Sequence, residues 1–446
     1  MIHMVQVGFA KQDLEAALRP VLPVREERIE AIGLYLSSDC LQCVWITLDF
    51  MDFDLHVIKT LTAAVQKSIG IDPMHIHIVT THNHGGGEPD PDVLSELAAQ
   101  CARNAMQNAA PAKIRWVCCK TDRQLNIIRR YPVPELGGVN TMYYGACEQN
   151  GFDSASSAQY AIEAVRSGRL SYSGQAETTR PAAPLPSGDD EIFAMQFCDD
   201  AEKVLGTVVR FAAHAVCCNL DGSYSSDYPY HVRRGMEDTF GGICLFWNGP
   251  CGDIAPAMTA KTDGTQRVLG EQIAQLAASA LRSVPYSPIH TFRDTAVSVP
   301  LPVRQEVRTG SVILPDTMPD PLPQRRMYLE TRLLAELMGF LQGKYRNGEP
   351  SPGDTISVSL GFLQLNDLLF TAFPGETFSV TGKALQDAFP DKSICTVTEH
   401  GRTVMYLPPD ADCKRGGYES VCRTTEPHAE HILRSGAITA AEVFLH

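Results

Sequence analysis

The 446 residues are 44% hydrophobic and carry a formal net charge of −14, so nucleic acid and anionic membranes, which need a basic surface, are not expected partners. No run approaches the roughly 20 apolar residues of a membrane span, so we expect no stable membrane insertion. The length is enough to bury a large core, and we expect a single large domain over residues 1–446.

The cysteines and the first residues indicate a cytoplasmic protein. Residues 1–13 lack the basic start and apolar core of an export signal. The 14 cysteines are scattered, and the adjacent pairs Cys118-Cys119 and Cys217-Cys218 seldom form disulfides, which favours reduced thiols. Cys40 and Cys43 have the spacing of a metal knuckle but no second pair. The sequence leaves homo-oligomers open.

Strand-like and helix-like patterns alternate along the chain, which favours an α/β fold with mixed β-sheets flanked by helices. We expect strands at 44–50, 74–80, 113–120, 192–197, 204–213 and from 368, and helices at 57–68, 90–106 and 325–344. Asp90 and Pro91 give the second helix a capping residue and a favourable first position. Residues 167–190 and 300–323 are predicted to be loops, because they are rich in small residues and proline.

His82 and His84 follow the alternating strand pattern of 74–80 and precede three glycines. A rigid strand end would hold both imidazoles on the same side, as a metal or catalytic site requires. The pattern alone is equally consistent with two polar residues that bond to the backbone in a tight loop.

Two further candidates also follow apolar β-runs. His214 ends the run of residues 208–214, although a lone histidine in such a setting is more often a satisfied core residue. Glu376 follows Pro374-Gly375 and is expected to open a helix, where the helix dipole favours the ionised carboxylate. On this local pattern alone, a helix-stabilising acid is the simpler interpretation of Glu376.

Several segments, in the same order along residues 40–425, resemble the catalytic domain of the neutral ceramidases, zinc-dependent amidases that cleave the N-acyl bond of ceramide. The segments are Thr81-His82-Asn83-His84-Gly85, Phe211-Ala212-Ala213-His214, Phe373-Pro374-Gly375-Glu376 and the tyrosines Tyr406 and Tyr418, twelve residues apart, with looser matches at 128–131, 226–229 and 248–256. The resemblance implies the fold of that catalytic domain without the family's C-terminal immunoglobulin-like domain.

The resemblance also implies a role for each residue. His82, His214, Glu376 and Tyr406 would bind zinc. His84 would face the scissile carbonyl, and Tyr418 would donate a hydrogen bond to the reacting oxygen. Arg129 would reach into the site, with Arg130 as the alternative, and the Ser226-Asp227-Tyr228-Pro229 segment would be structural support.

Two departures from the family pattern modify these expectations. Ala255 stands where ceramidases have a serine proposed as a nucleophile, which leaves a metal-activated water as the attacking group. Gly85 replaces the usual serine after the histidine pair. We therefore expect a zinc-dependent hydrolase that cleaves an amide in a small-molecule substrate more soluble than ceramide. Ester hydrolysis, non-hydrolytic chemistry on a polar metabolite, and a non-catalytic binding protein are the alternatives.

Overall fold

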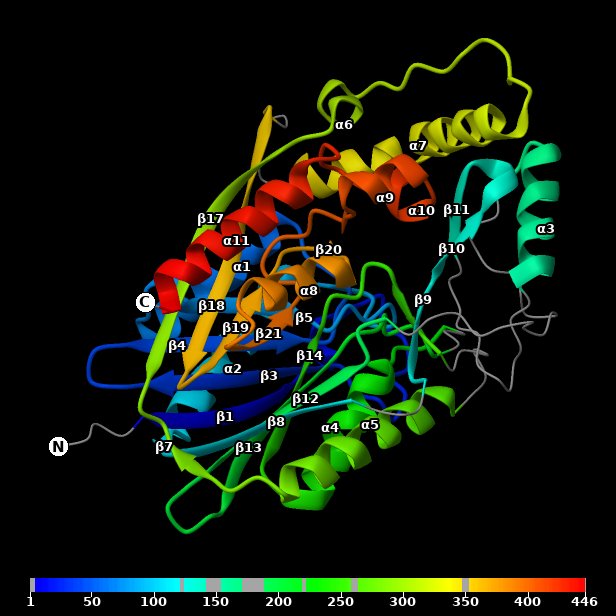
Figure 1. Cartoon of the computed structure of the whole chain (residues 1–446). Helices are drawn as coiled ribbons and strands as arrows, with labels where there is room; N and C mark the ends of the chain where they lie inside the picture. Colours follow the sequence, from blue (N-terminus) through cyan, green and yellow to red (C-terminus); the bar gives the residue numbers. More distant parts are fainter. Residues whose placement is uncertain are drawn as a thin grey trace.

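Three β-sheets form the centre of the molecule in this computed structural model, which describes residues 5–120, 124–141, 154–170, 188–218, 222–257, 264–346 and 353–445 (Figure 1). The first sheet has the order β5-β4-β3-β1-β7, the second β14-β13-β12-β8-β16 and the third β17-β18-β19-β21. The bounds are β1 Gln6–Asp13, β3 Glu30–Ser37, β4 Gln42–Leu48, β5 Ile76–Thr80 and β7 Ala110–Pro111; β8 Lys113–Lys120, β12 Glu191–Cys198, β13 Val204–Phe211, β14 Ile243–Asn248 and β16 Ser287–Pro288; β17 Phe292–Pro302, β18 Thr355–Leu365, β19 Leu368–Ala372 and β21 Ser393–Val397.

Each of these sheets combines antiparallel strands with one parallel pair. The parallel pairs are β4 with β5, β13 with β14, and β19 with β21. Short two-stranded pairs join β2 (Leu18–Arg19) to β6 (Glu88–Pro89), β9 (Asn126–Ile128) to β15 (Ile254–Pro256), β10 (Arg130–Val133) to β11 (Gly138–Thr141), and β20 (Glu376–Thr377) to β22 (Tyr406–Leu407). The mixed pairing confirms the α/β class with mixed sheets.

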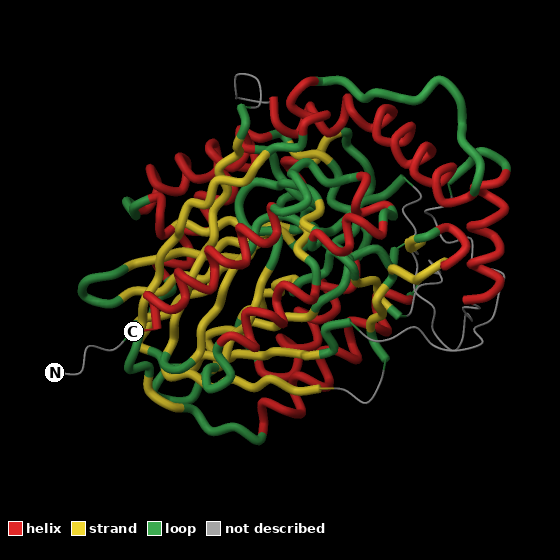
Figure 2. Tube along the Cα trace, turned by 45° about the horizontal axis from the view of Figure 1, so that its top comes forward, coloured by secondary structure: helices red, strands yellow, loops and turns green. Residues whose placement is uncertain are grey.

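Helices cover the outer faces of the sheets (Figures 1 and 2). The first sheet packs against α1 (Leu55–Ile69) and α2 (Pro91–Gln107), the second against α4 (Asp227–Phe240) and α5 (Thr265–Arg282), and the third against α8 (Ser379–Ala388) and α11 (Ala429–Leu445). The remaining described helices are α3 (Ser154–Arg166), α6 (Gln305–Thr309), α7 (Leu322–Arg346), α9 (Asp410–Arg415) and α10 (Tyr418–Val421). None of the helices in the described ranges is long and apolar enough to cross a membrane.

The inner faces of the three sheets share one hydrophobic core. Trp45 of the first sheet lies 5.3 Å from Trp247 of the second, and Trp247 lies 5.1 Å from Phe370 of the third, measured between ring centroids. All three side chains are fully buried. This packing sets the sheets against one another and so determines where their strand ends meet.

The expected elements are confirmed at 44–50, 57–68, 90–106, 113–120, 192–197, 204–213 and 325–344, within a few residues at the ends. Asp90 caps α2 by accepting hydrogen bonds from the backbone N–H groups of Asp92 and Val93. The loop expected at 300–323 is wrong in part, because β17 runs to Pro302 and α6 lies within it. Most of the loop expected at 167–190 falls on residues 171–187, outside the described part.

A buried group of polar side chains ties the first sheet to the third. Asp294 of β17 accepts hydrogen bonds from the ring nitrogens of Trp45 at 3.1 Å, His75 at 2.8 Å and His77 at 3.1 Å. The other ring nitrogen of His77 lies 3.1 Å from a ring nitrogen of His400, which follows β21. These bonds anchor β5, the strand that leads to His82.

Replacing Asp294 with asparagine should destabilise the fold in a pH-dependent way. Burial would raise the pKa of Asp294, but the charge of His77 and the hydrogen bonds from His75 and His77 outweigh it, so the pKa is lowered. A lowered pKa contributes stability above the unfolded value of about 4, and this contribution is lost as the pH falls further. Breaking such a buried pair costs about 3–5 kcal/mol at pH 7.

Urea unfolding midpoints at pH 7 and at pH 3 would measure this effect. The unfolding midpoint of Asp294→Asn should lie well below that of the wild type at pH 7, and the difference should be smaller at pH 3. Asp387→Asn, which removes an exposed pair with Lys383, is the control and should change little at either pH. An equal gap at both pH values would show that the Asp294 charge does not contribute.

Candidate metal centre

His82, His214 and Glu376 each lie shortly after the carboxyl end of a strand, and each strand belongs to a different sheet. The strands are β5, β13 and β19, one from each parallel pair. The shared core brings these strand ends together. His82 also has a φ of 53°, a left-handed conformation that a non-glycine residue adopts at a cost of about 1 kcal/mol or more.

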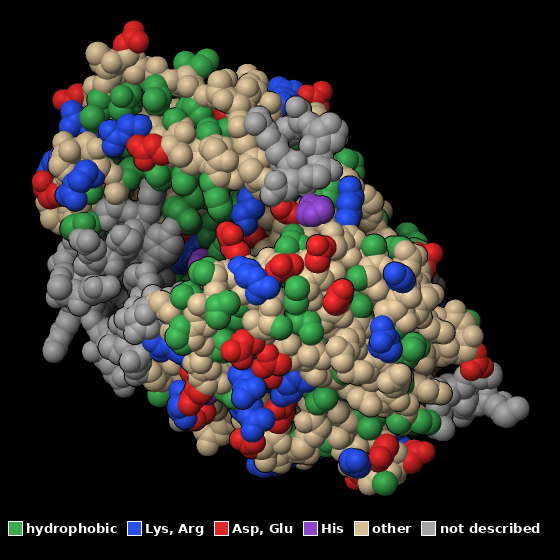
Figure 3. All heavy atoms as spheres, turned by 180° about the vertical axis from the view of Figure 1, so that it is seen from behind, with side chains coloured by type: hydrophobic (Ala, Val, Ile, Leu, Met, Phe, Trp, Pro, Cys, Tyr) green, Lys and Arg blue, Asp and Glu red, His purple; other side chains and the backbone are tan. Residues whose placement is uncertain are grey.

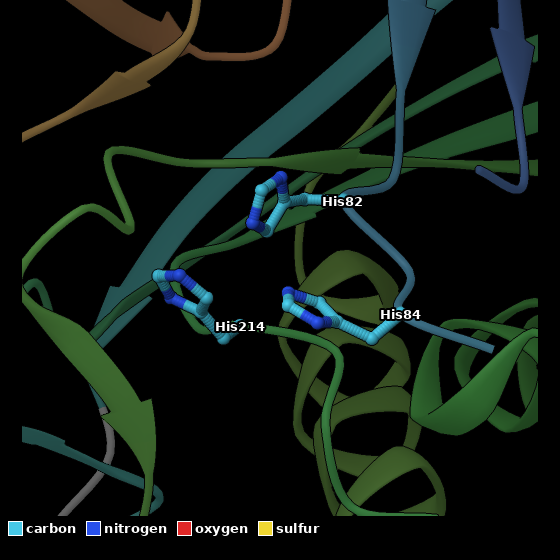
Figure 4. A group of neighbouring side chains, drawn as sticks. All are labelled: His82, His84 and His214. Carbon is cyan, nitrogen blue, oxygen red and sulfur yellow. The ribbon is translucent and has the colours of Figure 1, made fainter. Parts of the chain in front are cut away.

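The side chains of these three residues converge on one oxygen. Oε2 of Glu376 lies 2.9 Å from Nε2 of His214 and 3.3 Å from Nε2 of His82. His84 adds a third imidazole, and one ring nitrogen from each histidine lies within 4.8 Å of the others. Figure 4 shows the three rings around a common space. His82, His214 and Glu376 are buried, whereas His84 is exposed.

Backbone carbonyls orient both buried histidines. Nδ1 of His214 lies 2.9 Å from the carbonyl oxygen of Ile254, and Nδ1 of His82 lies 3.2 Å from that of Met51. Since a carbonyl oxygen only accepts, each Nδ1 carries a hydrogen, and each Nε2 faces the common space, where it offers a lone pair once it carries no proton. Nε2 of His82 is buried and makes no hydrogen bond, as expected of a metal ligand. Two imidazoles and a carboxylate are a donor set that zinc accepts.

The loop that carries His82 and His84 is bonded directly to the loop of His214. Asn83 forms a parallel bridge with Ala215, and the backbone N–H of His84 donates to the carbonyl of Ala215 at 3.4 Å. The side chain of Asn83 donates to the Ser225 carbonyl at 2.7 Å. Gly86 packs so closely that a Cβ atom there would lie 2.4 Å from the carbonyl oxygen of Asp49. The glycine-rich sequence therefore allows the loop to lie tightly against the first sheet.

The Ser226-Asp227-Tyr228-Pro229 segment holds the His214 loop from the other side. The hydroxyl of Tyr228 donates to the carbonyl of Ala213 at 2.7 Å. The carboxylate of Asp227 accepts from the backbone N–H of Cys218 at 2.6 Å. These bonds fix the backbone on both sides of His214.

Glu376 is ionised for a different reason from the one predicted. It does not open a helix, because it lies in β20, directly beside Tyr406 of β22, and α8 begins only at Ser379. Burial would raise the pKa of Glu376, but the charge of His82 and the close contact with His214 outweigh it and hold the pKa well below its usual value. The expectation of helix-dipole stabilisation is therefore wrong.

The two buried histidines differ in protonation. Burial and the nearby charge of Arg129 lower the pKa of His214 to about 4, so this ring is neutral at pH 7. Burial would also lower the pKa of His82, but the charges of Glu399 and Glu376 raise it well above its usual value. A cation that binds here must displace the proton of His82, so binding should release a proton.

Tyr406 and Arg129 lie beside the histidines. The hydroxyl of Tyr406 is 3.5 Å from Nε2 of His214 and accepts a hydrogen bond from Nη2 of Arg129 at 2.9 Å. The ring of Tyr418, half-buried at the start of α10, lies 5.6 Å from that of Tyr406. Both arginines bind Glu419, but Arg130 turns its other nitrogen to the carbonyls of Asp412 and Gly416. Arg129, and not Arg130, therefore reaches the residues of the candidate metal centre through Tyr406.

Glu399 also belongs to this group, and the sequence analysis missed it. Its carboxylate is buried, with Oε1 3.4 Å from Nδ1 of His82. The available signal was its place after the apolar run of β21, the same position that His82 and His214 occupy after their strands. An acid after a strand is usually an exposed loop residue, so the pattern did not distinguish it.

Comparison with known protein structures identifies the fold. No protein-family model matches the chain, and no curated protein matches it by sequence. The neutral ceramidase from Pseudomonas aeruginosa matches with a TM-score of 0.66 over 99% of this chain and 75% of its own, at 13% identity. A ceramidase complexed with C2 matches with a TM-score of 0.66 at 12% identity, over 99% of this chain and 76% of its own. The chain thus has the fold of the neutral ceramidases and spans about three quarters of the matched chains.

Proposed function

We propose that the protein is a zinc-dependent hydrolase that cleaves the amide bond of an N-acyl compound more soluble than ceramide. The observation that carries the proposal is the convergence of His82, His214 and Glu376 from three sheets, with Nε2 of His82 unbonded. Tyr406 would complete the ligand set, since its hydroxyl lies 3.5 Å from Nε2 of His214. The ceramidase fold supports amide hydrolysis as the reaction class.

Zinc bound at these residues would activate a water molecule and polarise the carbonyl that it faces. An amide is a poor electrophile, so hydrogen-bond donors must also stabilise the negative charge that grows on its oxygen. We assign this task to Tyr418 and to His84, the exposed histidine of the centre. Either side chain could then protonate the leaving amine. Arg129 holds the hydroxyl of Tyr406 and supplies a fixed positive charge.

The residue at position 255 supports attack by water. Ala255 is fully buried in β15 and offers only a methyl group, so no nucleophile can come from this position. Figure 3 shows a hollow on one face of the molecule, bordered by hydrophobic and charged side chains. Such a hollow suits a substrate with an apolar acyl group and a polar amine.

The proposal places the protein in the cytoplasm as a single catalytic domain acting on a small molecule. The cysteines of the described ranges are all free thiols, which supports a reducing compartment. The net charge of −14 would disfavour binding to an anionic membrane surface.

A substrate screen on the purified protein, with zinc and after removal of zinc by a chelator, tests the function. The panel would contain soluble N-acyl amines, the matching esters, and long-chain ceramide in detergent. We expect zinc-dependent turnover that is fastest on a soluble amide. Faster cleavage of ceramide than of all soluble compounds would contradict the proposed substrate class. Faster cleavage of the esters than of the matching amides would contradict the amide as the bond that is cleaved. No zinc-dependent turnover of any compound would contradict the proposed function.

The two tyrosines should respond differently to replacement by phenylalanine. Tyr418→Phe removes a proposed donor to the reacting oxygen, so turnover should fall about a hundredfold with zinc content unchanged. Tyr406→Phe removes a proposed ligand, so zinc affinity should fall together with the rate. Steady-state kinetics and zinc titration would measure both. Near wild-type activity in Tyr418→Phe would contradict its role.

A further inference from the structure

The backbone of Glu399 is held between the two loops that carry His82 and Glu376. Its carbonyl accepts from the backbone N–H of Thr80, the last residue of β5, at 3.1 Å. Its own N–H donates to the carbonyl of Gly375 at 3.4 Å. The φ of Glu399 is 61°, an unfavourable conformation for a residue with a Cβ atom. Such strain persists only where the surrounding structure imposes it, and it commonly accompanies a functional position.

The side chain of Glu399 points at the metal centre from behind His82. It is only 3% exposed, and its Oε1 makes no hydrogen bond although it lies 3.4 Å from Nδ1 of His82. Nδ1 of the same ring lies 3.2 Å from the carbonyl of Met51, so two acceptors compete for one hydrogen. The opposite nitrogen of the ring faces Glu376 at 3.3 Å. His82 is thus placed between two buried carboxylates.

His214 has a different environment. Its Nδ1 lies 2.9 Å from the carbonyl of Ile254. Apart from Glu376, which it shares with His82, the charged residue near its ring is Arg129. Ring nitrogens of metal-bound histidines commonly donate to a carboxylate or a carbonyl, which fixes the ring and makes the ligating nitrogen a stronger donor. A carboxylate has the larger effect because it is charged.

We propose that Glu399 is a positioning residue that accepts the Nδ1–H of His82 and strengthens Nε2 of His82 as the metal ligand. This inference rests on the proposed zinc centre and extends it to a residue that the ligand set does not include. It accounts for the orphaned oxygen and for the strained backbone at Glu399. It also makes the two histidines unequal, with His82 the stronger ligand.

Zinc affinity, measured by competition with a chromophoric chelator, tests the inference without reference to activity. Glu399→Gln keeps the size of the side chain and an acceptor oxygen but removes the charge, so zinc should bind about tenfold more weakly. Glu399→Ala removes the acceptor and should weaken binding by up to about a hundredfold. Glu430→Gln changes a buried acid that is bonded instead to Thr381 and Arg434, and it should leave zinc affinity unchanged.

The thermal unfolding midpoint of each metal-free variant separates positioning from simple support of the fold. We expect Glu399→Gln to lose zinc affinity with a midpoint close to that of the wild type. Wild-type zinc affinity in both Glu399 variants would overturn the inference and leave the proposed function intact. If the wild type itself binds no zinc, the proposed function fails, and the inference fails with it.

Discussion

Replacing His214 with alanine should greatly reduce zinc binding while leaving the fold largely intact. The ring lies in a loop beyond β13, with Nε2 2.9 Å from Glu376, so its loss removes one proposed ligand and leaves the sheets unchanged. We expect zinc affinity to fall by more than the roughly 10- to 100-fold that follows loss of an outer partner. Metal content by mass spectrometry of protein purified without chelator would measure it.

His231→Ala tests the alternative position, since this buried histidine bonds to Glu27 at 2.9 Å in a second group of side chains that could hold a cation. It should retain zinc at the wild-type level. Full retention of zinc in His214→Ala, or loss in both variants, would reject the proposed ligand set.

Replacing Glu419 with glutamine should strongly destabilise the fold. Its carboxylate is fully buried and accepts from Arg129 at 2.8 Å, Arg130 at 2.6 Å and Thr141 at 2.7 Å. The substitution leaves two buried guanidinium groups without their shared counter-charge, for which about 3–5 kcal/mol is the usual cost. Because Arg129 also holds Tyr406, metal affinity should fall as well.

The effect of Glu419 should depend on pH. Burial would raise the pKa of Glu419, but the charges of Arg130 and Arg129 and the bond from Thr141 outweigh it, so the pKa is lowered. Its contribution is therefore complete above the unfolded value of about 4.3 and is lost as the pH falls below it. Urea unfolding at pH 7 and pH 3 would measure this effect. The difference between the unfolding midpoints of the wild type and Glu419→Gln should be smaller at pH 3 than at pH 7. The exposed Glu442→Gln should shift the midpoint little, and an equally small shift in Glu419→Gln would contradict the prediction.

The candidate ligands were accessible to sequence analysis because each follows an apolar β-run. Period-two alternation indicated these strands to within a few residues, and His82 and His214 stand just beyond two of them. Their proximity was not accessible by this route, because it depends on the packing of three sheets around Trp45 and Trp247. The motifs that the chain shares with ceramidases, in the same order along the sequence, indicated indirectly that these residues lie close together.

The remaining differences have local physical reasons. Pro300 and Pro302 suggested a loop, but β17 is an edge strand of its sheet, where proline is tolerated because one side of the strand needs no partner. Glu376 was expected in a helix, yet pairing of β20 with β22 delays α8 to Ser379. The proposed role of Glu399 depends on a left-handed φ that no sequence pattern indicates.

Anomalous X-ray scattering at the zinc absorption edge, from crystals of the zinc-loaded protein, tests the proposed centre most directly. We expect one strong peak about 2.0–2.2 Å from Nε2 of His82, Nε2 of His214 and a carboxylate oxygen of Glu376. A second group of side chains, Glu26, Glu27 and His231, also has the geometry to hold a cation. A peak at that group with none between His82, His214 and Glu376 would contradict the account.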